Sequence, residues 1–219
     1  MNAVARIASR VLLGLAVCAV LIASVCICWF YFYSSDIPHF SDLAELAPDS
    51  PRTVSSPCSG TPIRVIPAAS MGNNLRGALR AAEGTNDEIL AMQVSRNLFC
   101  NSRVTMLKRH LLEYKAAVQM RRRFTSEQLV TTYLNQAPFG QDVVGAESAS
   151  LHYYGKHASE LDVPQAALIA GLIKAPSIYS PERHPDRAKE RRDLVIQGML
   201  RNGTITAEQA QAAEQIVLR

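Results

Sequence analysis

An uncharged apolar run near the N-terminus constrains this chain more than any other feature of its sequence. The run covers Val11 to Tyr33, 23 residues, and a helix that crosses a bilayer needs about 20 apolar residues. Arg6 and Arg10 precede the run, whereas the segment 34–51 after it carries four acidic residues and neither Lys nor Arg. Because the basic flank of a span stays in the cytoplasm, the sequence predicts a cytoplasmic tail (1–10), a transmembrane anchor (11–33) and an exported remainder.

A cleaved signal peptide is the alternative interpretation of the same run. The apolar part of a signal peptide is roughly 7–15 residues long and ends near a cleavage site of the Ala-x-Ala kind. Here the run is longer, and no such site follows it. Five aromatic residues, 29–33, close the run, which is typical of the boundary between a bilayer and water. We therefore expect an uncleaved anchor.

Beyond the anchor, the sequence predicts a connector (34–67) and then an all-α domain (68–219). Prolines with Ser, Thr and Gly mark 47–67 as irregular, compatible with either a disordered tether or an extended strand on the domain. Helical periodicity, capping residues and glycine stops predict the helices that follow. Their expected positions are 75–83, 87–99, 103–122, 125–136, a helix ending at 155, 162–174, 186–202 and 206–218.

Cysteine usage agrees with export of the domain. Cys18, Cys26 and Cys28 fall inside the apolar run, where thiols behave as small hydrophobic groups. Cys58 and Cys100 fall outside it, and a pair of cysteines in an oxidising compartment often forms a disulfide. We predict this pairing, with two unrelated buried thiols as the alternative.

Three sequence elements occur in one order through the C-terminal half. Residues 132–140 contain Tyr-Leu-Asn followed by Phe-Gly, residues 145–156 end in Tyr-Tyr-Gly-Lys, and residues 166–177 end in Leu-Ile-Lys-Ala-Pro-Ser. Together they resemble the peptidoglycan glycosyltransferase family, the lipid II polymerases found as domains of penicillin-binding proteins and as monofunctional enzymes. The resemblance covers roughly residues 75–205.

The resemblance implies a lysozyme-like α fold at the outer face of the bacterial inner membrane. It implies lipid II as the acceptor and an undecaprenyl-diphosphate-linked glycan as the donor, with cell-wall synthesis proteins as further partners. A carboxylate must take the proton of the attacking sugar hydroxyl. Cationic side chains, or a divalent metal such as Mg or Mn, must stabilise the departing diphosphate. A nucleic-acid partner is not expected, because the basic residues lack interleaved aromatic residues and the domain is exported.

The first two motifs of the family are only partly present. Glu83 follows Ala-Ala at a helix end and resembles the general base, although Gly84 stands where the family has Asp. The second motif survives mainly as Gln93, Arg96 and Asn97, which the resemblance makes substrate-binding residues. Glu83 and Asn97 are only 14 residues apart, where the family has a longer insert. A solvated carboxylate at a helix end is the alternative for Glu83.

The third motif is better preserved. Arg109 and Glu113 match its Arg and Glu, with Lys108 just before and His110 in the place of a Lys. The resemblance makes Glu113 the second catalytic carboxylate and a metal ligand, and Lys108 and Arg109 substrate-binding cations. Residues four apart share a helix face, so an exposed ion pair is the alternative. From 103 to 123 there are seven Lys or Arg and one acidic residue, which suits a diphosphate and anionic lipids.

The fourth and fifth motifs bear on charge and packing. Ser126 stands seven residues before Tyr133, where the family has a Lys, so one cation is lost. Arg191 and Arg192 match the fifth motif, and we expect them to tie helices together. The motifs together favour a lipid II polymerase. The incomplete ones favour a non-catalytic relative that binds lipid II or cell-wall proteins, and nothing beyond the shared fold favours a muramidase.

The predicted topology has a direct test. Reporter proteins fused after Ser35 and at the C-terminus should both be active only in the exported compartment, because the charge asymmetry places both sites outside. Activity of a cytoplasmic reporter at the C-terminus would contradict the predicted orientation.

Overall fold

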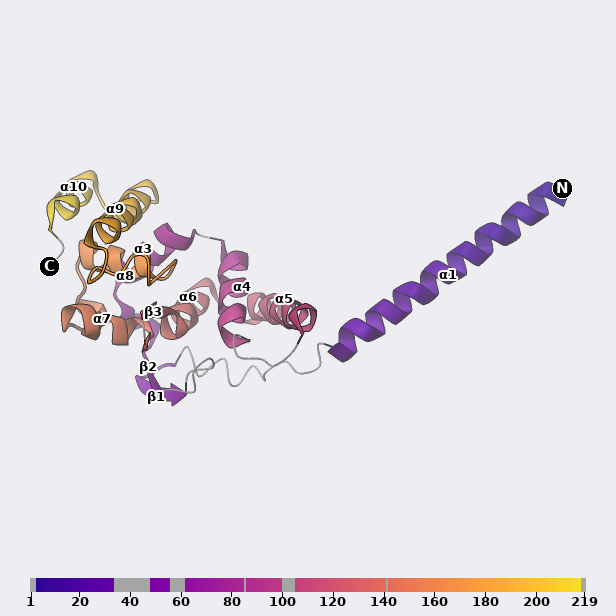
Figure 1. Ribbon diagram of the computed structural model, residues 1–219, viewed down its shortest axis with the longest axis horizontal. Helices are drawn as coiled ribbons and strands as arrows, with labels where there is room; N and C mark the ends of the chain where they lie inside the picture. The colour runs from indigo at the N-terminus through magenta and orange to yellow at the C-terminus, as the bar shows by residue number, and fades with distance from the viewer. Residues whose placement is uncertain are drawn as a thin grey trace.

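The computed structural model describes residues 3–33, 48–55, 62–84, 86–99, 105–140 and 142–217, with side chains from Arg10 onwards. The N-terminal helix α1 (Ala3–Tyr33) begins eight residues before the predicted span and ends where predicted. Its stretch Arg10–Phe32 is long and apolar enough to cross a membrane. Figure 1 shows α1 extending away from the rest of the molecule. Cys58 and Cys100 lie outside the described residues, so their pairing stays a prediction.

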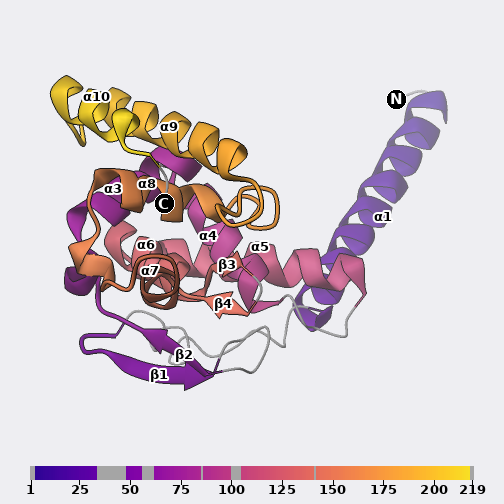
Figure 2. The same ribbon diagram turned by 60° about the vertical axis from the view of Figure 1, so that its left-hand side comes forward.

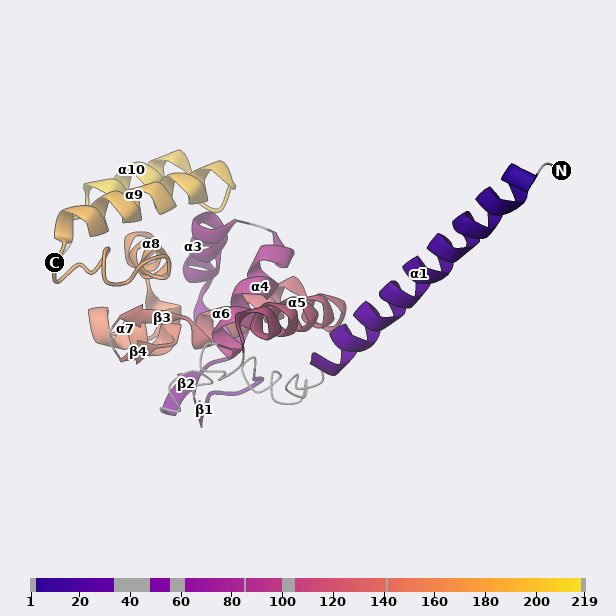
Figure 3. The same cartoon turned by 45° about the vertical axis from the view of Figure 1, so that its right-hand side comes forward.

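Helix α1 meets the domain at its aromatic C-terminal end. The Nζ atom of Lys115, on α5 (Met106–Arg123), lies 5.2 Å from the ring centroid of Tyr31 and 5.9 Å from that of Phe30. These distances allow cation–π attraction. Figure 3 shows α5 as the domain helix nearest the end of α1. The basic helix is therefore the element of the domain next to the predicted membrane boundary.

The connector contains a two-stranded hairpin, so of the two possibilities the structure has the extended strand. Strands β1 (Arg52–Ser55) and β2 (Pro62–Val65) pair antiparallel, and Figure 2 shows them at one edge of the helical domain. Ile63 and Val65 alternate inward along β2 and join the core together with Ile66. Packed structure therefore begins before the domain boundary predicted at residue 68.

The remainder is helical, as predicted, with one further short hairpin that the sequence did not indicate. Helix α3 packs against α8 and α9, α4 packs against α5 and α6, and α10 packs on α9. The elements are η1 (Ala68–Met71), α3 (Asn73–Glu83), α4 (Asp87–Leu98), α5, α6 (Ser126–Gln136), β3 (Pro138–Gly140), β4 (Val143–Val144), α7 (Ala146–Tyr154), η2 (Ala158–Glu160), α8 (Val163–Leu172), α9 (Pro185–Arg201) and α10 (Ala207–Gln215).

Side-chain caps fix most of these boundaries. Thr125 and Gln128 form the predicted capping box at the start of α6, and Asp162 caps α8 as expected. Gly155 ends α7 in the left-handed conformation, with φ 63°. Several helix ends differ from the expected positions: α8 stops at Leu172 rather than 174, α9 begins at Pro185 rather than 186, and α10 stops at Gln215 rather than 218. Proline suits the first turn of a helix because its missing N–H is not needed there.

Helix α8 is the buried centre of one half of the domain. Every residue from Val163 to Leu172 is buried apart from Val163 and Gln165, which are half-buried, as expected for a helix that is apolar on all sides. Arg191 donates from Nε to the carbonyl of Gly171 at 3.3 Å, and buried Arg192 donates to the carbonyl of Ile216 at 2.6 Å. The prediction that these arginines tie helices together is confirmed.

Asn135 fastens the hairpin segment to α6. Its side chain accepts a hydrogen bond from the backbone N–H of Ile66 at 3.0 Å and donates one to the carbonyl of Ile66 at 2.9 Å. Both partners are buried. A buried backbone group without a partner costs free energy, so this one amide satisfies two groups that the sheet leaves unpaired.

We expect Asn135→Ala to lower the free energy of unfolding by about 2–4 kcal/mol, because two buried backbone groups lose their partners. Denaturant unfolding of the detergent-solubilised protein, followed by circular dichroism, measures the change. Gln211→Ala, at an exposed position on α10, is the control and should stay within about 0.5 kcal/mol of wild type. A loss for Asn135→Ala as small as that of the control would contradict this account.

Candidate functional site

Glu83, the predicted base, is the last residue of α3 and is half-buried. Gln93, from the second turn of α4, donates a hydrogen bond from Nε2 to Oε2 of Glu83 at 2.6 Å. Burial raises the pKa of Tyr133 on α6, and the negative charge of nearby Glu83 raises it further. The two predicted site residues, a carboxylate and an amide from different helices, are therefore in hydrogen-bond contact, and a phenol from a third helix is near enough for the charge of the carboxylate to affect its pKa.

Glu113, the second predicted carboxylate, is buried on α5 with a side-chain exposure of 4%. Its Oε1 lies 3.4 Å from Nε of Arg109, the predicted partner one helical turn away. Its Oε2 lies 3.4 Å from Nδ1 of His110 and 4.0 Å from Nε of Arg96, which belongs to α4. One buried carboxylate thus lies next to three basic side chains, each with at least one-third of its side-chain surface exposed. Their outer faces are available to an anion.

Helix α4 joins the two carboxylates. Gln93 holds Glu83 and Arg96 faces Glu113, and residues three apart are neighbours on a helix surface. Asn97 is half-buried on the next position of α4, and Lys108 is half-buried in the first turn of α5. The structure therefore brings the predicted residues to one region around α4. That both carboxylates border a single cleft stays a prediction.

A further cation near this region was not predicted from the sequence. Ser126, which stands in the place of the family's lysine, accepts a hydrogen bond from Nη2 of Arg80 at 2.7 Å. Its hydroxyl donates in turn to Oδ1 of Asp87 at 2.7 Å. Arg80 lies on α3, one turn before Glu83. A guanidinium from a different helix therefore stands beside the position where the lysine is missing.

Polar atoms without partners mark the interface of α4 and α6. Among the described residues, Oε1 of Gln93, Oγ1 of Thr132 and Oε1 of Gln136 are buried and have no hydrogen-bond partner. Such atoms are rare in folded proteins, because each one costs free energy. Only Gln93 was predicted from sequence. Thr132 and Gln136 flank the Tyr-Leu-Asn element, and that proximity is the only sequence signal that could have indicated them.

The residues around Glu113 do not fit a divalent metal. Mg and Mn prefer several oxygen ligands, whereas both oxygens of Glu113 face basic side chains. Within the part of the chain that the structure describes, no group of three or more His, Cys, Asp or Glu residues is placed to hold a metal ion. The described residues alone do not supply the oxygen ligands that Mg or Mn requires.

The sequence matches a known protein family. The family model described as Transglycosylase matches residues 67–200. The chain belongs to the transglycosylase family. The predicted membership of the peptidoglycan glycosyltransferases is thereby confirmed, and it agrees with the lysozyme-like helical fold expected for the domain.

Several penicillin-binding proteins are similar to this chain. Penicillin-binding protein 1A of Aquifex aeolicus is 38% identical over 152 residues, 69% of this chain and 20% of that protein. Penicillin-binding protein 1F of Bacillus subtilis is 35% identical over 68% of this chain and 21% of that protein. Penicillin-binding protein 1A of Rickettsia felis is 32% identical over 86% of this chain and 29% of that protein.

A solved structure is also similar to this chain. The crystal structure of penicillin-binding protein 1A from Haemophilus influenzae matches with a TM-score of 0.46 and 25% identity, over 78% of this chain and 21% of that one. The chain thus spans between a fifth and three-tenths of the length of these relatives.

A double-mutant cycle tests whether Glu113 and Arg109 form a buried electrostatic unit. We expect Glu113→Gln and Arg109→Gln to show a coupling free energy of about 1–2 kcal/mol, because one partner is almost fully buried. The pair Lys189 and Asp193, also four apart but with exposures of 53% and 25%, is the matched control. It should show at most about 0.5 kcal/mol. Chemical unfolding measures both cycles, and equal couplings would contradict the assignment.

Proposed function

We propose that this chain is a membrane-anchored peptidoglycan glycosyltransferase that polymerises lipid II at the outer face of the bacterial inner membrane. The observation that carries the proposal is the transglycosylase family match over residues 67–200. The geometry adds support, because the predicted base Glu83 is held by Gln93. The apolar helix α1, long enough to cross a membrane, supports the anchor.

In the proposed reaction, Glu83 acts as the general base. A hydroxyl of the lipid II acceptor attacks the anomeric carbon of the undecaprenyl-diphosphate-linked glycan, and its proton passes to the carboxylate of Glu83. The bond from the anomeric carbon to the diphosphate breaks as the new glycosidic bond forms. Gln93 binds one carboxylate oxygen, which fixes the orientation of the base before the substrate arrives.

The cations around Glu113 suit the leaving diphosphate. The side chains of Arg96 and Arg109 are 64% and 38% exposed beside the buried carboxylate, and guanidinium groups bind phosphate oxygens through paired donors. Lys108 lies on the same first turn of α5 as Arg109. In this role Glu113 positions the arginines and lowers the cost of holding them together, while their free donors stabilise the charge that develops.

A second candidate is a relative that binds the same lipid-linked substrate without polymerising it. The observation in its favour is that the ion pairs described at this region gather on Glu113 and not on Glu83. Such a protein would keep the diphosphate-binding cations while its base is inactive. It would act by holding lipid II or by recruiting cell-wall synthesis proteins.

A lipid II polymerisation assay on the detergent-solubilised full chain separates the two candidates. We expect glycan strands from the wild type and a loss of at least about 100-fold in rate for Glu83→Gln, because the amide keeps the shape and removes the base. Glu190→Gln, at an exposed position on α9, should leave the rate unchanged.

Binding of a fluorescent lipid II is measured in parallel. Arg96→Gln with Arg109→Gln should weaken binding by about 100-fold or more, since each of the two charged contacts contributes about 1.5–3 kcal/mol. If the wild type and Glu83→Gln are equally inert while lipid II still binds, the second candidate stands and the catalytic proposal fails. If lipid II does not bind, both fail.

A further inference from the structure

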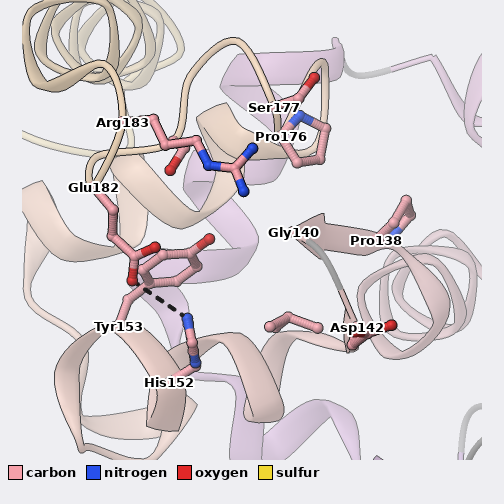
Figure 4. Close-up of a pocket in the computed structure, with 11 residues that line it drawn as sticks. Pro138, Gly140, Asp142, His152, Tyr153, Pro176, Ser177, Glu182 and Arg183 are labelled. Carbon is pink, nitrogen blue, oxygen red and sulfur yellow. Dashed lines mark ion pairs between the residues drawn. The ribbon is translucent and has the colours of Figure 1, made fainter.

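One group of polar side chains outside the proposed reaction lines a cavity of about 620 Å³. Its walls come from the β3–β4 hairpin, α7 and the loop between α8 and α9, as Figure 4 shows. There Nε2 of His152 lies 3.6 Å from Oε1 of Glu182, and the two side chains are 46% and 67% exposed. That distance is too long for a hydrogen bond, and exposed ion pairs contribute little to stability. This pair therefore holds its surroundings only weakly.

A second group of polar side chains joins three helices by shorter contacts. Nη2 of Arg80, in the last turn of α3, donates a hydrogen bond to Oγ of Ser126, the first residue of α6, at 2.7 Å. The same hydroxyl donates to Oδ1 of Asp87, the first residue of α4, at 2.7 Å. All three residues are half-buried. We call this set the three-helix junction.

The chemistry of the junction fixes the direction of both hydrogen bonds. A guanidinium only donates and an ionised carboxylate only accepts, whereas a hydroxyl does both. Ser126 is therefore the acceptor for Arg80 and the donor to Asp87. Hydrogen bonds to charged groups are stronger than those between neutral groups, and bonds in a chain polarise one another. The junction is therefore a firm contact between α3, α6 and α4.

The junction connects two groups of helices that carry different predicted site residues. Helix α3 packs against α8 and α9, whereas α4 packs against α5 and α6, and Figure 3 shows the two groups side by side. Glu83 ends α3, whereas Gln93 and Glu113 belong to α4 and α5. The position of the predicted base relative to the other site residues therefore depends on contacts between the two groups.

The end of α3 is held within its own group. Arg191, on α9, donates from Nη2 to the carbonyl of Ala82 at 3.5 Å. Gly198, also on α9, approaches α3 so closely that an added Cβ would lie 3.0 Å from the Cβ of Ala81. The backbone that carries Glu83 is therefore held by α9.

The start of α4 is held by Asp87. Its neighbours at 86, 88 and 89 are exposed, whereas Asp87 is half-buried. Glu88 also faces Arg121 on α5 at 3.3 Å, but these side chains are 67% and 47% exposed, and such a pair contributes little. The hydrogen bond from Ser126 is therefore the stronger of these two contacts at the first turn of α4.

We propose that Arg80 is a positioning residue for the predicted base. Through Ser126 and Asp87, its guanidinium fixes where α4 begins relative to the end of α3. The same placement keeps Gln93 within hydrogen-bond distance of Glu83. The role of Glu83 as base rests on the proposed function, whereas the junction and its effect on Gln93 do not.

The test compares two arginines on one face of α3. Arg76, one turn before Arg80, pairs with Glu127 of α6 and Asn73 of α3, contacts that leave α4 out. Arg80→Met keeps the apolar stem and removes the donors. It should lower kcat for lipid II polymerisation by about tenfold or more, because a misplacement of about 1 Å can cost about 100-fold. KM should stay within about twofold, since substrate binding is not affected. Arg80→Lys should recover most of the rate, and Arg76→Met, the matched control, should keep it.

Hydrogen exchange of the detergent-solubilised full chain, followed by mass spectrometry, tests the junction without catalysis. In Arg80→Met, the amides of the N-terminal half of α4 should exchange about tenfold faster or more than in the wild type, because a released helix start opens more often. In Arg76→Met they should exchange as in the wild type. Circular dichroism checks that both variants keep the helical fold.

Several outcomes would overturn the proposal. Equal effects of Arg80→Met and Arg76→Met reject it, as does an unchanged kcat in an active protein. A raised KM with kcat retained would make Arg80 a substrate-binding residue instead. If the wild type does not polymerise lipid II, the exchange measurement decides. Faster exchange in Arg80→Met alone then supports the positioning while the proposed catalysis fails, and equal exchange rejects both.

Discussion

Paired hydrogen bonds between Asn135 and the backbone of Ile66 tie two distant parts of the domain together. They bind the hairpin segment to α6 across 69 residues of sequence. The same turn of α6 lies against Gly145, where an added Cβ would come within 2.9 Å of the Asn135 carbonyl. With φ 87°, Gly145 has both a conformation and a spacing that only glycine meets without strain. The Tyr-Leu-Asn element and the glycine after it are thus two sides of one packing contact.

The same helix also passes near the predicted base. Tyr133, two residues before Asn135 on α6, lies close enough to Glu83 for the carboxylate to affect its pKa. After Asn135 the chain enters the β3–β4 hairpin and α7. A loss of Asn135 would therefore disturb the helix beside Glu83 and the elements that follow it.

The two predicted carboxylates differ in the way their charge is balanced. Glu113 is buried and surrounded by basic side chains on its own helix and on α4. Without this carboxylate, those cations would face each other unpaired. Glu83 is half-buried and is held at one oxygen by a neutral amide. This difference supports separate roles, with Glu83 as base and Glu113 as the support of the diphosphate-binding cations.

The sequence predicted what local chemistry determines. Helix starts at Thr125 and Asp162 followed from capping residues a few positions from their partners. The sequence did not distinguish the hairpin in the connector from a tether. Its strands are only four residues long, and the inward-facing residues of β2 are buried only by contact with a core that is distant in sequence. The Arg80 contact with Ser126 joins residues 46 positions apart. No pattern along the chain indicates such a pairing, since it depends on how α3 meets α6.

The departure of the first motif from the family pattern has a physical reason in the turn from α3 to α4. Gly84, in the place of the family's Asp, has φ 89° and ψ 170°, a region that is essentially restricted to glycine. With this backbone, α4 begins at Asp87, and Gln93 comes within hydrogen-bond distance of Glu83. An Asp at 84 would oppose that turn. The short connection and the glycine therefore belong together, and they place the amide of α4 on the carboxylate.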